Sequence, residues 1–322
     1  MQPNEPWTVK RILDWTAGYF DRRRLEAPRL SAELLLGHVL GKSRIMLYAE
    51  HDKPLEPMQL ETYRRLVARA AEHEPIAYLT GTAHFFNLEL AVSPAVLIPR
   101  PETETLVEHV LQDARSLPPE AQPGVLDVCT GSGCIALAVT RHLKGARTTA
   151  VDLSPAALDV AAGNASRLGL TERVTFAEGD LFEAVDAEAR FDIITANPPY
   201  IPSPQIAGLD RNVRDFEPHL ALDGGPDGLA VFRRIVEALP TYLNPGGRFY
   251  IEIAFDQADA AAEVVAGTPG LVQPRVIKDL QGHPRVVAGA AEGAAAAPVV
   301  PVVPVVPVAP DMPEASEPAS DA

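Results

Sequence analysis

Asn197, Pro198, Pro199 and Tyr200 form a tetrapeptide that could hold a flat group carrying an NH2. The side-chain carbonyl of Asn197 can accept one N–H. The backbone carbonyl of Pro198 can accept another, because the fixed proline φ angles direct that carbonyl. The ring of Tyr200 can stack on a planar substrate. An NH2 group held in this way could be methylated, although Asn-Pro-Pro is also a common turn sequence.

A glycine-rich turn lies upstream, between a predicted strand at 125–128 and a predicted helix that begins near Ile135. Strand, glycine turn and helix in this order begin a nucleotide-binding βαβ unit, in which the backbone approaches the ligand closely and the helix amides face it. The third glycine of the dinucleotide pattern is missing, so a pyrophosphate is not the expected ligand. The turn consists of Cys129, Thr130, Gly131, Ser132, Gly133 and Cys134.

Acidic residues follow the next two predicted strands. Asp152 ends a strand at 148–151 and lies about 20 residues beyond Gly133, where a carboxylate takes the hydroxyls of a ribose. Asp180 follows a predicted strand at 174–177 and could accept from an adenine amino group while Leu181 packs on the ring. Either acid alone is more often a solvated loop residue. Chance does not readily place a glycine turn, two acids and Asn-Pro-Pro-Tyr in order on four strand ends.

This order of motifs resembles a class I S-adenosylmethionine-dependent methyltransferase. Within that superfamily the chain is similar to the N5-glutamine methyltransferases of the HemK/PrmC type, which modify class I peptide chain release factors. The segment 92–104 is similar to the part of that family which leads into its catalytic domain, and the tetrapeptide 197–200 matches as well. The resemblance covers roughly residues 5–290. Further matches lie at 85–86, 216–218, 220–222, 224–229 and 278–283.

The resemblance implies an α/β fold in which a Rossmann-like methyltransferase domain follows a small helical domain. It implies S-adenosylmethionine as the cofactor and, as the substrate, a glutamine in the Gly-Gly-Gln loop of a release factor, whose modification supports translation termination. Asn197, Pro198 and Tyr200 are the expected catalytic residues, and Pro199, Phe86 and Arg100 are expected to contact the substrate with them. The expected cofactor-binding residues are Asp127, Cys129, Thr130, Gly131, Ser132, Gly133, Asp152, Asp180, Leu181 and Asn197.

The reaction that these residues would support depends mainly on alignment. An amide nitrogen is a weak nucleophile because its lone pair is delocalised, whereas a sulfonium is a strong methyl donor that requires no metal. The enzyme must therefore hold nitrogen, methyl carbon and sulfur in line. Acceptors on the N–H groups would favour the charge that develops on nitrogen. A carboxylate base is not required before the transfer, because the proton on the methylated amide nitrogen is very acidic and leaves readily.

Two departures from the family pattern leave an alternative substrate open. Cys129 stands where the release-factor enzymes usually have glycine, and Cys134 where alanine is common. This turn looks more like that of the enzymes which methylate a glutamine of ribosomal protein L3. The segments 99–104 and 278–283 favour the release-factor group, and they span more residues.

An alternative from another class is an enzyme that methylates adenine or guanine in nucleic acid, since a flipped base also presents an NH2. Charge argues against it. The chain has a net charge of −15, its first 90 residues are balanced, and the excess acid lies in the rest. An enzyme of nucleic acid normally shows a basic face. A non-catalytic module that only retains the fold is also disfavoured, because Asn197, the glycine turn and both acids are intact.

Composition predicts four segments. We expect a helical substrate-recognition domain at 1–80, with helices at 7–20, 28–40 and 57–73 bounded by Gly41 and Pro75. A hairpin linker is expected at 81–92 and the methyltransferase domain at 93–290. The Pro/Val-rich acidic tail at 291–322 is expected to be disordered, because it cannot pack a core.

The remaining features predict a cytoplasmic enzyme with no membrane partner and no direct nucleic-acid substrate. The two cysteines cannot form a zinc site alone, and no histidine has a further ligand at metal-binding spacing, so no metal is expected. No basic and apolar leader begins the sequence, and no apolar run approaches the length of a membrane span.

Overall fold

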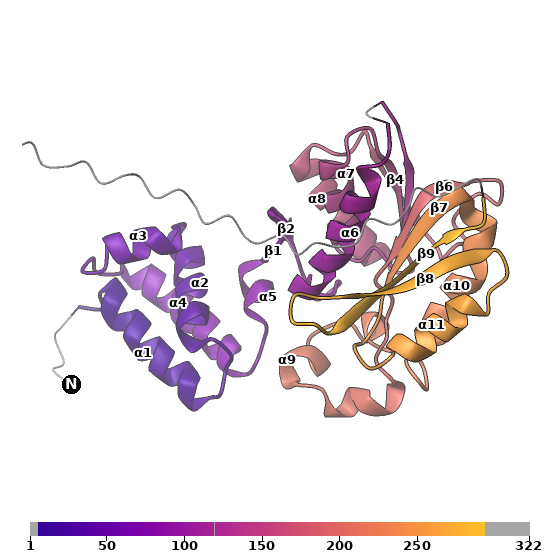
Figure 1. Ribbon diagram of the computed structural model, residues 1–322. Coiled ribbons are helices and arrows are strands. Elements are labelled where there is room, and N and C mark those ends of the chain that lie inside the picture. The colour runs from indigo at the N-terminus through magenta and orange to yellow at the C-terminus, as the bar shows by residue number, and fades with distance from the viewer. Residues whose placement is uncertain (1–5, 119, 294–322) are drawn as a thin grey trace, which may run out of the picture.

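The computed structural model describes residues 6–118 and 120–293. The tail predicted at 291–322 lies outside these residues except for its beginning, and Ala291 is the last residue of a strand. A helical domain and a sheet domain lie side by side (Figure 1). The fold predicted from the sequence, an α/β domain preceded by helices, is confirmed.

The helical domain contains three longer helices that correspond to the predicted ones. Helix α2 has the predicted bounds and ends at Gly41, which takes the left-handed conformation that glycine adopts without strain. Two short helices, α3 and α5, were not predicted, because one or two turns show no hydrophobic periodicity. The helices are α1 (Val9–Arg22), α2 (Pro28–Leu40), α3 (Arg44–Ala49), α4 (Pro57–Ala71) and α5 (Ile76–Thr80).

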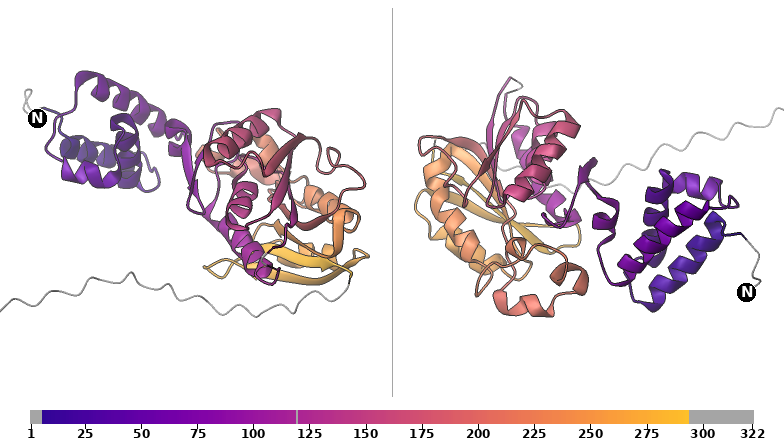
Figure 2. Two further views of the ribbon diagram at one scale, coloured as in Figure 1. Left: turned by 90° about the horizontal axis from the view of Figure 1, so that it is seen from above. Right: turned by 180° about the vertical axis from the view of Figure 1, so that it is seen from behind.

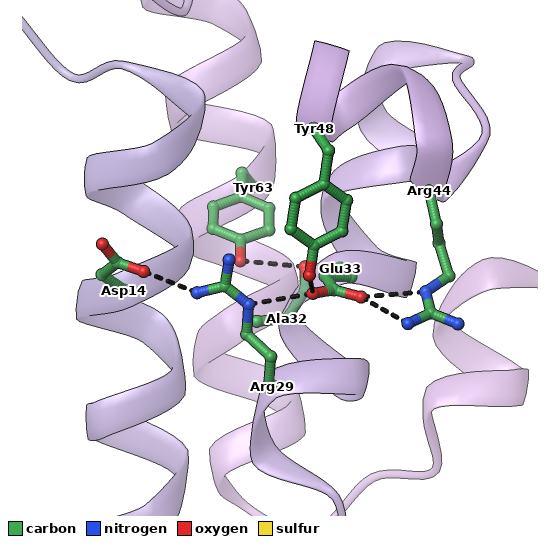
Figure 3. A network of polar contacts seen from close by, with 7 residues as sticks. All are labelled: Asp14, Arg29, Ala32, Glu33, Arg44, Tyr48 and Tyr63. Carbon is green, nitrogen blue, oxygen red and sulfur yellow. Dashed lines mark hydrogen bonds and ion pairs between the residues drawn. The ribbon is translucent and has the colours of Figure 1, made fainter. Parts of the chain in front are cut away.

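A buried carboxylate, that of Glu33, joins α2 to its neighbours (Figure 3). It accepts hydrogen bonds from Arg29 Nε at 2.9 Å and Arg44 Nε at 2.8 Å, and from the hydroxyl of Tyr48. Arg29 also contacts Asp14 on α1. Burial raises the pKa of the Glu33 carboxyl, but the hydrogen bonds from Tyr48 and the arginines outweigh it and hold that pKa below its usual value. The network therefore fixes α1, α2 and α3 as one unit.

A hairpin of β1 (Thr82–Phe85) and β2 (Leu88–Ala91) follows the helices and lies between the two domains (Figure 1). Asn164 of α8 (Pro155–Leu168) fixes it to the sheet domain. Its side-chain oxygen accepts from Ala91 N at 2.7 Å, and its Nδ2 donates to the carbonyls of Ala91 and Ser132. One buried amide thus connects the hairpin to the glycine turn.

The sheet domain has a seven-stranded sheet in the order β5-β4-β3-β6-β7-β9-β8. All neighbours are parallel except β9, which is antiparallel to both β7 and β8. The chain moves outward from β3 to β5 and then returns to the other side of β3 with β6. A ligand site is expected at this reversal, beyond the carboxyl ends of the strands. The strands are β3 (Gly124–Val128), β4 (Arg147–Asp152), β5 (Val174–Glu178), β6 (Phe191–Ala196), β7 (Leu243–Glu252), β8 (Leu271–Lys278) and β9 (Pro284–Ala291).

Helices cover both faces of this sheet (Figures 1 and 2). Helices α6, α7 and α8 pack on one face, around Leu106, Ile135 and Ala165. Helices α10 and α11 pack on the other, around Phe232 and Val265. No helix in residues 6–118 and 120–293 is long and apolar enough to cross a membrane. The new elements are α6 (Glu104–Ala114), α7 (Cys134–His142), α9 (Arg211–Arg214), α10 (Ala230–Tyr242) and α11 (Ala258–Ala266), with 3₁₀ turns η1 (Pro101–Thr103), η2 (Ser203–Gly208) and η3 (His219–Ala221).

Candidate active site

A cavity of about 360 Å³ lies where the carboxyl ends of the central strands meet. Such a volume is within the range of small-molecule sites. The structure brings together on its wall a set of residues that the sequence analysis selected, namely Cys129, Asp152, Asp180, Leu181, Asn197 and Pro199.

The glycine turn after β3 has a left-handed backbone at three positions, with φ of +58° at Cys129, +56° at Gly131 and +80° at Gly133. A Cβ at Gly133 would stand 3.1 Å from the side chain of Leu137 and 3.2 Å from that of Ala161, so glycine lets the turn lie against both helices. Burial raises the pKa of the Cys129 thiol. That residue therefore presents a neutral sulfur to the cavity.

Asp127 is completely buried and supports the turn from behind. Its carboxylate accepts hydrogen bonds of 2.6 Å from the hydroxyls of Thr130 and Thr195, which connects the turn to β6. Burial raises the pKa of Asp127 to about 6, against the opposing effect of the two hydroxyls. Thr130 and Ser132 are also buried. These three shape the turn, and of the residues predicted to bind cofactor, Asp127, Thr130, Gly131, Ser132 and Gly133 do not lie on the cavity wall.

Asp152 ends β4 and is oriented by backbone donors. Its Oδ2 accepts from Gly131 N at 2.7 Å, and its Oδ1 accepts from Ser154 N at 2.9 Å. Burial raises its pKa, and these backbone N–H groups oppose that shift. A carboxylate oxygen can accept more than one hydrogen bond. Asp152 can therefore hold the turn and still accept hydroxyls from a ligand.

Asp180 and Leu181 follow β5 and also line the cavity. Asp180 forms an ion pair of 2.9 Å with Arg234 of α10, which the sequence analysis did not select. No motif surrounds Arg234, and a charged residue on an amphipathic helix gives no signal for a site. Leu181 is buried and has a φ of +56°. Together they form a wall with one apolar and one polar side.

Asn197 follows β6 directly, and its Nδ2 donates to the hydroxyl of Thr103 at 3.3 Å. Asn197 and Pro199 line the cavity, whereas Pro198 is buried. We expected the ring of Tyr200 to stack on a substrate. In the structure the hydroxyl of Tyr200 donates to Glu252 Oε1 at 3.4 Å. Tyr200 is not part of the cavity wall in this structure.

Two glycines lie directly against this tetrapeptide. A Cβ at Gly224 would stand 2.7 Å from the carbonyl oxygen of Pro199. A Cβ at Gly228, where φ is +77°, would stand 2.3 Å from that of Tyr200. The turn at 224–229 is therefore a support for the backbone of the tetrapeptide, which gives a physical reason for the glycines in that sequence match.

Arg100 and Phe86, which we expected to contact a substrate, have other partners. Arg100 donates to both carboxylate oxygens of the buried Glu217, at 2.8 and 2.7 Å, and so holds the loop before η3 against the segment before η1. Phe86 packs edge-on against His142, and its backbone N–H donates to Glu104. The structure does not bring either residue to the cavity wall.

Glu252, at the end of β7, is a buried acid that the sequence analysis missed. Only 2% of it is exposed, and burial raises its pKa to about 7. Its Oε2 has no hydrogen-bond partner among the described residues. Glu252 directly follows the apolar run 249–251. An acid at the end of a predicted strand is the sequence signal that could have identified it.

Comparisons with known proteins agree with this geometry. A family described as the PrmC N-terminal domain matches residues 11–81, and one described as a methyltransferase domain matches residues 125–216. The release factor glutamine methyltransferase of Geobacter sulfurreducens is 45% identical over 285 residues, which cover 88% of this chain and 97% of that protein. The enzyme of the same name from Rhodopirellula baltica is 40% identical over 284 residues, with 88% and 96% covered.

A likeness to a solved structure extends to the fold alone. The hMettl16 catalytic domain, solved in complex with a 3′UTR hairpin, has a TM-score of 0.51 and 17% sequence identity. The match covers 65% of this chain and 77% of that one. At this identity the similarity supports the α/β architecture and carries no information on the substrate.

Proposed function

This chain belongs to the release factor glutamine methyltransferase family, and from that membership we propose which of its residues hold the cofactor and the target glutamine. The chain is an S-adenosylmethionine-dependent methyltransferase that acts on a glutamine of a release factor. Its relatives match over most of its length and carry that name, so methylation of ribosomal protein L3 or of a nucleic-acid base is not favoured.

We propose that the cavity at the strand ends holds S-adenosylmethionine, which supplies the methyl group on a sulfonium. Asp152 would accept the ribose hydroxyls, because the backbone donors of Gly131 and Ser154 already orient its carboxylate toward the cavity edge. Leu181 would pack on the adenine, and Asp180 would accept from its amino group. The apolar wall, the two carboxylates and the volume of about 360 Å³ fit such a ligand.

We propose that Asn197 binds the target glutamine, because it lies on the same cavity wall as Asp152, which would bind the cofactor. Its side-chain oxygen and the carbonyl of Pro198 would accept the two N–H groups of the glutamine amide. This would align the nitrogen with the methyl group and stabilise the charge that develops on it. Asn197, Pro198 and Pro199 would thus form a slot for the glutamine amide, and Pro199 would limit its width.

The target is proposed to be the Gly-Gly-Gln loop of a class I release factor. We also propose that residues 1–80 form the surface that recognises that protein. Support comes from the apolar side chains that this domain leaves in solvent, among them Ile45, which is 80% exposed, and Met58, which is 78% exposed. A domain with a packed core of its own does not need such residues for folding.

The test is methyl transfer from labelled cofactor to purified release factor, ribosomal protein L3 and nucleic acid in parallel. We expect label in the release factor alone, and none after its target glutamine is replaced by glutamate, because a carboxylate has no N–H to donate. Efficient labelling of L3 or of DNA, with none in the release factor, would refute the proposed substrate.

A further inference from the structure

Behind the proposed slot, three polar side chains form a path from Asn197 to a buried acid. Asn197 Nδ2 donates to Thr103 Oγ1 at 3.3 Å, and 1% of Thr103 is exposed. Thr103 also lies close enough to Glu252 to favour the ionised form of its carboxyl and so to lower its pKa. Glu252 Oε1 accepts from the hydroxyl of Tyr200 at 3.4 Å, whereas Oε2 has no hydrogen-bond partner among the described residues. The hydroxyl of Thr103 thus lies between the slot residue Asn197, to which it is bonded, and a buried carboxylate with an unpartnered oxygen.

The direction of these hydrogen bonds follows from the number of protons available. A hydroxyl has one hydrogen, and an ionised carboxylate can only accept. Glu252 Oε2 has no hydrogen-bond partner among the described residues, and Thr103 favours the ionised form of Glu252, so we assign the hydrogen of Thr103 to that oxygen. Thr103 then has only lone pairs left for Asn197, and these require an N–H.

We propose that Glu252 and Thr103 are positioning residues that fix the Asn197 amide with its NH2 toward Thr103 and its oxygen toward the substrate. The inference rests on the proposed role of Asn197 in holding the target amide. The two ends of an asparagine amide have nearly the same shape, so packing alone does not choose between them. A flipped Asn197 would direct its NH2 at the substrate NH2. Both groups are hydrogen-bond donors, so no hydrogen bond could form between them.

The charge on Glu252 determines whether this selection operates. Arg285 on β9 favours the ionised form, Glu102 on η1 opposes it, and the Tyr200 hydroxyl donates to it. Burial, the largest effect, raises the pKa to about 7. When pH falls through that value, a protonated Glu252 can donate to Thr103, whose hydroxyl can then donate to the Asn197 oxygen. The rate should therefore fall as pH decreases between about pH 8 and pH 6.

The sharpest test compares Thr103→Val, which keeps the shape of the side chain but lacks the hydroxyl, with Thr103→Ser, which restores it. In single-turnover methylation of the release factor, we expect Thr103→Val to lose roughly 10-fold or more, by analogy with the loss of one preorganised polar contact at a reacting centre. Thr103→Ser should recover most of that loss. Cofactor affinity should stay within about twofold in both, since Thr103 is not on the cavity wall.

Two further variants separate positioning from simple support of the fold. Thr105→Val removes another buried threonine hydroxyl close by and should leave the rate unchanged. Glu252→Gln should slow the reaction and abolish the decrease between about pH 8 and pH 6. Asp127 has a pKa raised to about 6, so a decrease that survives in Glu252→Gln would assign it to Asp127 and refute the role of Glu252.

Asn197→Ala in the same assay separates this inference from the proposed function. If Asn197→Ala is slow while Thr103→Val reacts within twofold of the parent, the slot stands and the positioning role is wrong. If Asn197→Ala reacts at the parent rate, the proposed slot itself is wrong. Equal losses in Thr103→Val and Thr103→Ser, with lower melting temperatures, would show that Thr103 only supports packing.

Discussion

The carboxylate of Asp152 accepts a hydrogen bond of 2.7 Å from the backbone N–H of Gly131. This contact joins the end of β4 to the glycine turn after β3, so the two elements proposed to bind the cofactor share one side chain. The same carboxylate has lone pairs left for the ribose. Asp152 therefore holds the turn and, in the proposed site, would also contact the ribose.

Replacement of Asp152 by alanine should weaken S-adenosylmethionine binding. The expected loss is about 1.5–3 kcal/mol, the range of a hydrogen bond to a charged group. Asp152→Asn keeps an acceptor but lacks the charge, so its loss should be smaller. Calorimetry of both variants measures this, and unchanged affinity in Asp152→Ala would remove Asp152 from the site.

Arg100→Ala should destabilise the fold, because it leaves the buried Glu217 carboxylate without its partner. Removing one partner of a buried pair costs about 3 kcal/mol or more. Burial raises the pKa of Glu217, and Arg100 opposes that shift. The variant should therefore regain part of its stability as pH falls, since a protonated Glu217 is easier to bury.

Urea unfolding of Arg100→Ala and of the double variant Arg100→Met/Glu217→Gln measures this. The double variant lacks the buried charge and should be the more stable of the two at neutral pH. Equal stability of Arg100→Ala and the parent would show that the ion pair contributes nothing to the fold.

Gly228→Ala should reduce turnover more than cofactor binding. The new Cβ would stand 2.3 Å from the carbonyl oxygen of Tyr200, at a residue whose φ is +77°. Relief of this contact must shift the backbone of the tetrapeptide. Gly208→Ala is the matched control, because nothing lies within 4 Å of its Cβ position. Similar rates in the two variants would show that the turn at 224–229 does not support the slot.

Deletion of residues 294–322 should leave melting temperature and turnover nearly unchanged. The last strand, β9, ends at Ala291, and the backbone N–H of Glu292 donates to Gly270 O, so the deletion retains every described element. From its Pro/Val-rich composition we expect the deleted segment to contribute little to a packed core. A melting temperature several degrees lower after truncation would show that the tail contributes to the fold.

Local sequence predicts what lies at strand ends, because parallel strands bring their carboxyl ends to one edge. Asp152 and Asn197 each follow an apolar run, and both line the same cavity. The contact between Thr103 and Asn197 could not be predicted in this way, since 94 residues separate them and no periodicity connects them. Arg234 was missed for a similar reason, because its partner Asp180 comes from a different part of the chain.

Family resemblance indicates which residues matter without giving their contacts. It selected Arg100 and Phe86, and the structure pairs them with Glu217 and His142. It also selected Tyr200, whose hydroxyl donates to Glu252. Those partners depend on packing between distant segments, which neither composition nor spacing determines.

The most direct test of the proposed mechanism is the single-turnover rate of Asn197→Ala with the release factor as substrate. If its oxygen holds the glutamine NH2, the methyl-transfer rate should fall on the order of 10²-fold or more while cofactor affinity changes little. A methyl-transfer rate equal to that of the parent enzyme would contradict the assignment of Asn197 to the reacting amide.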